Sequence, residues 1–337
     1  MNKIKTEIQC SIGPACESPE ILAEMLQAGM TVARVNLSHG TAESQAAKLE
    51  AFREACRIAG NPDAKIMFDI CGPEVRITEL PDGPLEWRTG ETVVLPEVTY
   101  KDFSKEVAPG AELLIDDGKV RLEVVHIDGD DIVCEVKLGG VVESRKGVNT
   151  PDIKLHMEYL SERDKNDILW AIEHGVDYIA GSFIRRADDV RILRDFIKEN
   201  GGGHIGVIAK LENKEAITNL EAIAAEADQV LVARGDMGVE IGFEKVPGVQ
   251  KRLIRRCNDL GKPVIVATQL LDSMQHSPLP TRAEVSDVAN AIYDGATALL
   301  VTGETTVGEY PVEVVKELVK IAEQAELDLA RYGSEIL

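Results

Sequence analysis

Several features that would place a chain in a particular class of protein are missing from these 337 residues. Basic residues are scarce beside acidic ones, 37 against 58, so the formal net charge is −21. An acidic surface repels nucleic acids and anionic membranes, and we therefore expect no nucleic acid and no membrane as a partner. The longest apolar runs are strand-like and too short to span a bilayer.

Signals for export and for metal binding through cysteine are missing as well. The N-terminus, Met-Asn-Lys-Ile-Lys-Thr-Glu-Ile, has basic residues but no apolar signal core. The six cysteines are scattered and include no CxxC pair, a pattern typical of reduced thiols rather than of a disulfide framework or a zinc site. Both observations predict a cytoplasmic protein.

Strand-like and helix-like segments alternate through most of the chain. Ser18 and Pro19 open a helix after the first strand, and Gly175 and Gly261 end later helices. Each predicted strand is followed by a helix or by the segment 76–149. The eight predicted strands are Thr6–Ile12, Thr31–Leu37, Lys65–Phe68, Asp177–Gly181, 205–209, 229–233, 263–267 and 297–301.

Residues 76–149 interrupt this alternation. They contain short alternating runs separated by turn signals such as Asp116-Asp117-Gly118, which predict a small β-barrel inserted after the third strand. The remaining segments, 1–75 and 150–337, are together close to the roughly 250 residues of a (β/α)8 TIM barrel, and we expect this α/β fold. An open doubly wound sheet is the alternative, but no GxGxxG motif follows the first strand.

The carboxyl ends of the predicted strands are polar. In a (β/α)8 barrel these ends line one site. Here almost all of them carry polar or charged residues, and both signs of charge occur, which a barrel with only structural duties would not need. The residues at the strand ends are Arg34, Asn36, Ser38, Asp69, Ser182, Lys210, Glu212, Gly235, Asp236, Thr268, Gln269, Thr302, Gly303 and Glu304.

The chemistry of this set indicates a divalent metal and a phosphate. Glu212 and Asp236 offer hard oxygen ligands on adjacent strands, which suit Mg²⁺ or Mn²⁺. Arg34 and Lys210 would balance the negative charge of a phosphoryl group. Gly235 could open a short helix whose free N–H groups bind a carboxylate or phosphate, or form an ordinary turn. The structural alternative for the two acids is an ion-pair network with nearby basic residues.

A second cation site is predicted on the second and third strands. Asn36, Ser38 and Asp69 supply neutral and anionic oxygens close together, and a weakly charged cage favours a monovalent ion. The alternative is plain hydrogen bonding between the two strands. His39, which follows Ser38 directly, would contact a nucleotide phosphate or cap the next turn.

A series of short stretches along the whole chain carries a family resemblance. In chain order they are Cys10-Ser-Ile-Gly-Pro-Ala, Ala33-Arg-Val-Asn-Leu-Ser-His-Gly, Gly72-Pro-Glu-Val-Arg, Leu114-Ile-Asp-Asp-Gly, Lys146-Gly-Val-Asn, Ile208-Ala-Lys-Leu-Glu-Asn, Ala233-Arg-Gly-Asp-Met-Gly-Val-Glu, Gly261-Lys-Pro-Val-Ile-Val-Ala-Thr-Gln, Pro280-Thr-Arg-Ala-Glu-Val-Ser-Asp-Val-Ala-Asn and Gly303-Glu-Thr. Together, and in this order, they resemble the pyruvate kinase family.

The resemblance implies both a domain organisation and a reaction. The catalytic barrel would comprise residues 1–75 and 150–337, with residues 76–149 as an inserted lid. Phosphoenolpyruvate and ADP would give pyruvate and ATP, with Mg²⁺ (or Mn²⁺) and K⁺ as cofactors. Glu212 and Asp236 resemble the Mg²⁺ ligands. The residues that resemble the K⁺ site are Asn36, Ser38, Asp69 and, through its main-chain carbonyl, Ile70.

The resemblance also implies roles at the reacting groups. Arg34 and Lys210 match the residues on the transferred phosphoryl group, and Lys210 would also steady the enolate. The N–H groups of Gly235 and Asp236 would hold the substrate carboxylate.

Proton transfer and nucleotide binding are implied for a second set of residues. Thr268 would lie beside the carbon that is protonated, with Thr302 in the proton relay. ADP or ATP, as co-substrate, would be bound by His39, Arg76 and Lys146.

The chain departs from the family pattern in places. Ile70-Cys71 stands where Thr-Lys is usual before Gly-Pro-Glu, which removes a lysine from the phosphate side. The sequence stops at Leu337, so the family's C-terminal effector domain, and activation through it, are not expected. The segment 281–294, with Arg282, matches a subunit contact of the family, and we expect a homodimer through these late barrel helices.

Two other functions stay open at this point. A related metal-dependent barrel enzyme of the lyase type would act on another phosphoenol or 2-oxoacid substrate and would need no nucleotide. A non-catalytic paralogue would bind a metabolite without turnover. The retained lid and Lys146 argue against the first function, and the presence of Lys210, Glu212, Asp236 and Thr268 argues against the second.

Overall fold

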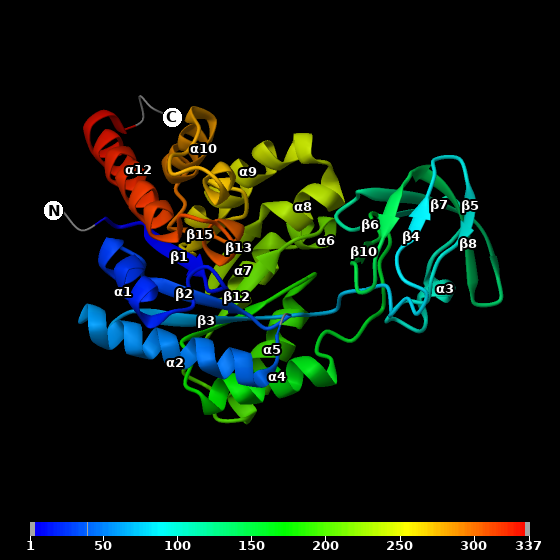
Figure 1. Cartoon of the computed structure of the whole chain (residues 1–337), viewed down its shortest axis with the longest axis horizontal. Helices are drawn as coiled ribbons and strands as arrows, with labels where there is room; N and C mark the ends of the chain where they lie inside the picture. The colour runs from blue at the N-terminus through cyan, green and yellow to red at the C-terminus, as the bar shows by residue number, and fades with distance from the viewer. Residues whose placement is uncertain (1–3, 39, 334–337) are drawn as a thin grey trace.

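The main unit of the fold is a closed barrel of eight parallel strands surrounded by helices (Figure 1). The computed structural model describes residues 4–38 and 40–333. Around the barrel the strands are ordered β1-β15-β14-β13-β12-β11-β3-β2, so the predicted (β/α)8 barrel is confirmed. Their bounds are β1 Glu7–Ser11, β2 Val32–Asn36, β3 Lys65–Ile70, β11 Tyr178–Gly181, β12 Gly206–Leu211, β13 Gln229–Ala233, β14 Val264–Ala267 and β15 Ala298–Val301.

Helices cover the outside of the barrel, and several begin at side chains that cap them. Thr281 and Glu284 form a capping box, and Ser161 and Asp164 form another. Among the described residues, no helix has the length and apolar character needed to cross a membrane. The helices are α1 Pro19–Ala28, α2 Ala42–Ala59, α4 Glu162–Glu173, α5 Ala187–Glu199, α6 Lys214–Thr218, α7 Leu220–Glu226, α8 Arg234–Ile241, α9 Val246–Asp259, α10 Arg282–Tyr293, α11 Gly303–Thr306 and α12 Pro311–Tyr332.

The inside of the barrel explains why the site residues face one another. Side chains alternate between the two faces of a strand, so residues two positions apart point the same way. Arg34, Asp69 and Lys210 each stand two positions after a residue of the interior apolar cluster, towards the carboxyl end of the strand. The interior cluster consists of Val32, Met67, Ala180, Ile208, Leu231, Ala233, Ile265, Ala267, Ala298 and Leu300.

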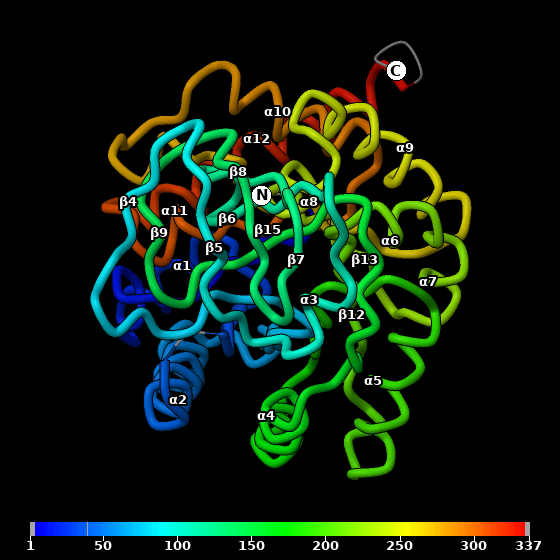
Figure 2. Tube along the Cα trace, turned by 90° about the vertical axis from the view of Figure 1, so that its right-hand side faces the viewer, coloured from blue at the N-terminus to red at the C-terminus, as the bar shows by residue number. Residues whose placement is uncertain are grey.

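Residues between β3 and α4 form a separate unit beyond the carboxyl ends of the barrel strands (Figures 1 and 2). The segment expected to be an inserted β-barrel forms two antiparallel sheets, one of five strands in the order β10-β6-β7-β8-β5 and one that pairs β4 with β9. It has an apolar core of its own. Its boundaries at 76 and 149 stay a prediction. The elements are β4 Leu85–Trp87, β5 Thr92–Val94, α3 Phe103–Glu106, β6 Glu112–Ile115, β7 Val120–Asp128, β8 Asp131–Leu138, β9 Gly140–Val142 and β10 Val148–Asn149.

One carboxylate on the barrel's outer layer is poorly satisfied. Asp167 lies on α4, and its buried Oδ2 atom finds no hydrogen-bond donor among the described residues and is 3.8 Å from Arg163 Nε. Burial raises the pKa of Asp167 to about 6, and the neighbouring Asp164 adds to the shift, while Arg163 opposes it. The folded state therefore favours the protonated acid.

Asp167→Asn should stabilise the fold in a pH-dependent way. Because the folded pKa lies above the unfolded one, the wild-type free energy of unfolding falls as the pH rises from about 4 through about 6. The variant carries no such charge, so at pH 8 it should be about 1 kcal/mol more stable than wild type, with solvent screening considered. At pH 4, near the unfolded pKa, the two should be nearly equal. Urea unfolding at both pH values measures this, and a variant that is less stable at pH 8 would contradict it.

Candidate active site

A buried ammonium group occupies the centre of the barrel mouth. Lys210 Nζ lies 3.2 Å from Asp69 Oδ1 and 3.0 Å from Glu212 Oε1. It also donates to Ser182 Oγ at 2.8 Å, and that hydroxyl donates to Asp69 Oδ1 at 2.9 Å. All four side chains are buried. One cation is thus shared by two carboxylates that lie away from bulk water.

Arg34 brings a second cation to the same acid. Its Nη2 atom is 2.6 Å from Asp69 Oδ2, and its Nη1 donates to Ser11 Oγ at 2.8 Å. Burial alone would raise the pKa of Asp69, but Lys210 and Arg34 outweigh it and hold the pKa below its usual value. Burial would likewise lower the pKa of Lys210, yet Asp69 and Glu212 raise it well above the usual range. Asp69 and Lys210 are therefore charged at neutral pH.

Glu212 and Asp236 are two acids next to this network, and the pKa of each is raised. Burial, with the charge of Asp236 in addition, raises the pKa of Glu212 to about 7 although Lys210 opposes the shift. The pKa of Asp236 is also raised, chiefly by burial, with Asp117 and Glu74 adding to the effect. The two side chains are within hydrogen-bonding reach of each other. A cation between them would relieve the cost of two buried negative charges.

The backbone of Phe183 fixes the orientation of Glu212. Its N–H donates to Glu212 Oε2 at 2.6 Å, and its φ of 52° lies in the left-handed region. A non-glycine residue is uncommon in this region and costs free energy there. The turn after β11 therefore places an N–H on the acid and leaves the other oxygen to Lys210.

Most of the predicted site residues surround one inner pocket of about 150 Å³. Arg34 and Lys210, the expected phosphoryl ligands, lie there with the two acids, Glu212 and Asp236. Thr268, Thr302 and Lys146 do not line this pocket, and Ile70 packs in the apolar core outside the barrel. The lining residues are Arg34, Asn36, Ser38, Asp69, Cys71, Glu74, Arg76, Ser182, Phe183, Lys210, Glu212 and Asp236.

The oxygens expected to hold a monovalent cation are hydrogen-bonded in this structure. Asn36 Oδ1 accepts the N–H of Ser38 at 2.9 Å, and Ser38 Oγ accepts the Cys71 thiol at 3.1 Å. Both oxygens of Asp69 already contact the two cations. The arrangement agrees with hydrogen bonding between strands, and the K⁺ site stays a prediction.

The residues expected on the nucleotide side lie where β3 leads into the inserted unit. Arg76 Nη2 pairs with Glu74 at 2.7 Å, and Arg76 lines the inner pocket. Lys146 Nζ lies 3.1 Å from Asp116 and 3.3 Å from Glu143. Arg76 and Gly147 form a β-bridge, which puts Lys146 directly next to the strand that carries Arg76. His39 lies outside the described residues.

A strained turn at the end of β14 carries Thr268. The φ angles of Thr268 and Gln269 are 74° and 51°. The Arg234 guanidinium donates to the carbonyl oxygens of both residues and forms an ion pair with Asp287 on α10 at 2.6 Å. Thr268 Oγ1 accepts the N–H of Gly235 at 2.9 Å, so this N–H, which was expected to hold a substrate carboxylate, has a protein partner here.

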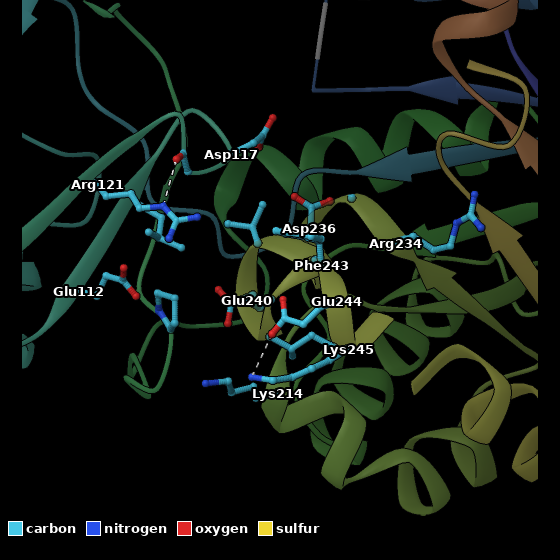
Figure 3. Close-up of a pocket in the computed structure, with 18 of the residues that line it drawn as sticks. Glu112, Asp117, Arg121, Lys214, Arg234, Asp236, Glu240, Phe243, Glu244 and Lys245 are labelled. Atoms are coloured by element: carbon cyan, nitrogen blue, oxygen red, sulfur yellow. Dashed lines mark hydrogen bonds and ion pairs between the residues drawn. The ribbon is translucent and has the colours of Figure 1, made fainter. Parts of the chain in front are cut away.

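A larger cleft of about 650 Å³ opens on the other side of Asp236, between the inserted unit and α8. Figure 3 shows Arg121, on β7, extending into this cleft from the inserted unit, opposite Asp236 and Glu240 of α8. Asp117, from the turn between β6 and β7, also lines the cleft. Gly235 lines the same cleft. Asp236 therefore lines both spaces: the small inner pocket, which also contains the side chains of Arg34 and Lys210, and the wide cleft under the inserted unit.

Some members of the site were not assigned a role from the sequence. Ser182 was recognised only as a strand-end residue, and Glu74 only as part of the Gly72-Pro-Glu stretch. Nothing in the sequence pointed to the Phe183 N–H or to Arg234 as the group that holds the Thr268 turn, because both act through the backbone. Within the described residues no group of three or more His, Cys, Asp or Glu side chains is arranged to hold a metal, so Glu212 and Asp236 stand as a pair.

Comparisons with known proteins agree with this geometry. The family model described as pyruvate kinase, barrel domain, matches residues 3–315. Pyruvate kinase of Geobacillus stearothermophilus is 47% identical over 337 residues, which cover 96% of this chain and 57% of that protein. The values for Bacillus licheniformis are 46% over 335 residues, 96% and 57%, and for Clostridium acetobutylicum 41% over 337 residues, 96% and 71%. The chain thus spans little more than half the length of the first two relatives.

Lys210→Met should reveal the energetic role of the shared ammonium. It leaves Glu212 without a cation and Asp69 with Arg34 alone, and breaking a buried ion pair in this way costs about 3–5 kcal/mol. The loss in the free energy of unfolding should be largest at pH 8. It should be smaller at pH 6, because Glu212, with its raised pKa, is then protonated.

Lys214→Met is the matched control for this prediction. Lys214 lies four residues later and pairs with the exposed Asp152, so its removal should cost less than about 1 kcal/mol at either pH. Urea unfolding of both variants gives the comparison. Equal stability of the two variants at pH 8 would show that Lys210 is not needed to hold the carboxylates together.

Proposed function

The chain belongs to the pyruvate kinase family, and on this premise we propose that it transfers the phosphoryl group of phosphoenolpyruvate to ADP, giving pyruvate and ATP. The observation that carries the proposal is the buried Lys210, shared by Asp69 and Glu212 and joined by Arg34 at the carboxyl ends of the barrel strands. Phosphoryl transfer depends mainly on positioning and on electrostatic stabilisation of this kind.

The phosphoryl step uses the two buried cations. The P–O bond to the enol oxygen breaks, a P–O bond to a terminal oxygen of ADP forms, and the electron pair of the broken bond stays on the enolate. In the inner pocket Arg34 and Lys210 offer positive charge to the equatorial phosphoryl oxygens and to the enolate oxygen. Their fixed contacts with Asp69 mean that little rearrangement is needed when the charge moves.

The acids next to Lys210 fit a divalent cation. Glu212 and Asp236 are hard oxygen donors, adjacent and partly deprived of water, and the raised pKa of each reflects burial near other negative charge. Mg²⁺ or Mn²⁺ at this pair would neutralise charge on the phosphoryl group when bound, with substrate oxygens and water as its further ligands. For K⁺ we propose Asn36, Ser38, Asp69 and the carbonyl of Ile70.

Proton delivery completes the reaction. The enolate left after transfer takes a proton at its methylene carbon. We assign Thr268 and Thr302, which directly follow β14 and β15, to this side of the substrate. The substrate carboxylate would take the N–H groups of Gly235 and Asp236, and Gly235 would then release the Thr268 hydroxyl, which it now contacts. The nucleotide is assigned to Arg76 and Lys146, and also to His39.

The proposed reaction can be measured with a coupled assay for ATP or pyruvate formation. Wild-type protein with phosphoenolpyruvate and ADP should turn over only when Mg²⁺ or Mn²⁺ is present and faster when K⁺ is added. Thr268→Val, which removes the hydroxyl, should lower kcat by about 100-fold, the usual size of a lost proton-transfer group. Thr218→Val on α6, whose hydroxyl donates to the carbonyl of Lys214 within the same helix, is the control and should keep full activity.

Failure of wild-type protein to form ATP with both cations present would remove the proposal. In that case, loss of phosphoenolpyruvate or release of another product without a nucleotide would favour the lyase-type alternative. Binding of phosphoenolpyruvate without turnover would favour the non-catalytic one.

We also propose a homodimer through the late barrel helices. Apolar side chains are exposed near the start of α10, with Leu279 63% and Val285 37% exposed, and Phe243 after α8 is 80% exposed. Arg282 opens α10 and lies between Leu279 and Val285 in the sequence. Uncovered apolar groups of this size favour contact with another protein surface.

Light scattering should give twice the 36.7 kDa mass of one chain. Arg282→Glu should shift the protein to the mass of a single chain, since it places a negative charge in the proposed contact. Arg331→Glu, near the end of α12, is the control and should leave the mass unchanged. A wild-type protein that scatters as a monomer at micromolar concentration would contradict the proposal.

A further inference from the structure

The turn at the end of β14 is held in a conformation that the chain would not adopt unaided. Thr268 and Gln269 both have positive φ angles, and each non-glycine residue in this region costs about 1–3 kcal/mol. Arg234 holds the carbonyl side of the turn, as described above. A second charged side chain, Glu304 of α11, holds its N–H side.

Glu304 connects the ends of two neighbouring strands. Its Oε1 atom accepts the N–H groups of Leu270 at 3.2 Å and Leu271 at 3.1 Å, just after the strained turn of β14. Its Oε2 atom accepts the N–H of Thr302 at 2.9 Å, just after β15. One carboxylate therefore fixes the backbone beside Thr268 and the backbone of Thr302.

The position of Glu304 is itself tightly constrained. The side chain is 1% exposed, and none of the described lysine, arginine or histidine side chains forms an ion pair with it. A Cβ atom built at Gly308 would lie 2.3 Å from the Glu304 carbonyl oxygen, so the backbone at Glu304 is packed without spare room. The next residue, Thr305, donates through its hydroxyl to the carbonyl of Ser11 at 2.8 Å and so ties this segment to β1.

A carboxylate is needed here because all three contacts are N–H donors. Both oxygens of Glu304 act as acceptors, and a buried carboxylate without a cation is stable only when its oxygens are satisfied in this way. The amide of glutamine has the same shape but only one oxygen. Its NH₂ group would face an N–H on one of the two strands, and that tether would be lost.

We propose that Glu304 is a positioning residue for proton transfer: by tethering both strand ends it sets the Thr268 and Thr302 hydroxyls relative to each other and to the carbon that is protonated. The inference rests on the proposed function. Neither Glu304 nor its partners Leu270, Leu271 and Thr302 line the inner pocket, so its effect should fall on proton transfer rather than on capture of the phosphoryl group. A displacement of about 1 Å in such a group lowers a rate by about 100-fold.

Glu304→Gln tests this inference, and the chain offers a matched control. Glu326 on α12 also accepts backbone N–H groups, from Lys5 at 2.9 Å and from Thr6 at 2.8 Å, but at the amino end of β1, away from the barrel mouth. Glu326→Gln removes the same kind of contact but leaves the strand ends that carry the Thr268 and Thr302 hydroxyls unchanged. A third variant, Glu304→Asp, keeps the charge and both acceptors on a shorter side chain.

Two activities should be compared in each variant. The first is ATP formation from phosphoenolpyruvate and ADP, with kcat and KM. The second is the exchange of the methyl hydrogens of pyruvate with deuterium in D₂O, in the presence of MgCl₂, KCl and inorganic phosphate, followed by ¹H NMR. This exchange removes a proton from the methyl group and returns a deuteron, so it reports proton transfer without phosphoryl transfer.

Glu304→Gln should slow the pyruvate exchange by about 10–100-fold while the KM for phosphoenolpyruvate stays within about twofold. Glu304→Asp should recover part of the exchange rate, and Glu326→Gln should match wild type. Hydrogen exchange at the amides of Leu270, Leu271 and Thr302 should be faster in Glu304→Gln alone, which confirms that the tether has been cut.

The outcomes separate this inference from the proposed function. If wild-type protein catalyses neither ATP formation nor pyruvate exchange, the proposed function fails, and the role of Glu304 in proton transfer fails with it. If wild-type protein is active and Glu304→Gln exchanges pyruvate at the wild-type rate, only this inference is overturned. The inference is also overturned if Glu304→Gln and Glu326→Gln lose both activities equally, since the carboxylate would then serve general stability.

Discussion

The ammonium group of Lys210, shared by the buried carboxylates of Asp69 and Glu212, is the interaction on which the barrel mouth depends. Three buried charges without this contact would each carry a desolvation cost of several kcal/mol. Arg34 makes the cluster nearly balanced by adding a second cation on the far oxygen of Asp69. The charge that remains unbalanced is negative and lies at Glu212 and Asp236. The pKa of each of these acids is raised. The cluster is thus prepared for a cation at one end and a phosphoryl group in the middle.

This arrangement follows from the way successive side chains of a barrel strand point alternately to the inside and the outside of the barrel. Apolar side chains such as Ile208 fill the interior, and the inward position two residues further along each strand reaches the mouth. The fold can therefore keep its interior apolar and still bring charged residues of several strands into direct contact at its mouth. The inserted unit covers this end, and Asp236 lies where the inner pocket meets the cleft beneath that unit.

The sequence was sufficient for the barrel and for the charged residues at its mouth, because both depend on periodicity and on strand ends. Interactions made through the backbone could not be foreseen in the same way. The Phe183 N–H on Glu212, the positive φ angles of Thr268 and Gln269, and the two-strand tether of Glu304 leave no distinctive residue pattern. The helical segment after β12 is likewise divided into α6 and α7 at Asn219, whose side chain donates to the carbonyl of Arg185.

Two hypotheses were made for Glu212 and Asp236: an ion-pair network with nearby basic residues, and a site for a divalent metal. They describe the same two acids without and with a bound metal. Glu212 pairs with Lys210 in this structure, as the alternative holds, yet its pKa stays high, so the pairing with one lysine does not satisfy it. Asp236 adds a further negative charge: burial, Asp117 and Glu74 raise its pKa, and the cation that opposes this shift is again Lys210. The unbalanced charge supports a divalent cation at this pair.

Binding of Mn²⁺, followed by electron paramagnetic resonance, tests this central claim most directly. Wild-type protein should bind about one Mn²⁺ per chain at this pair, and Glu212→Gln should abolish that binding while its circular dichroism spectrum stays that of wild type. Undiminished Mn²⁺ binding in the folded Glu212→Gln variant would contradict the account, because the cation would then lie elsewhere.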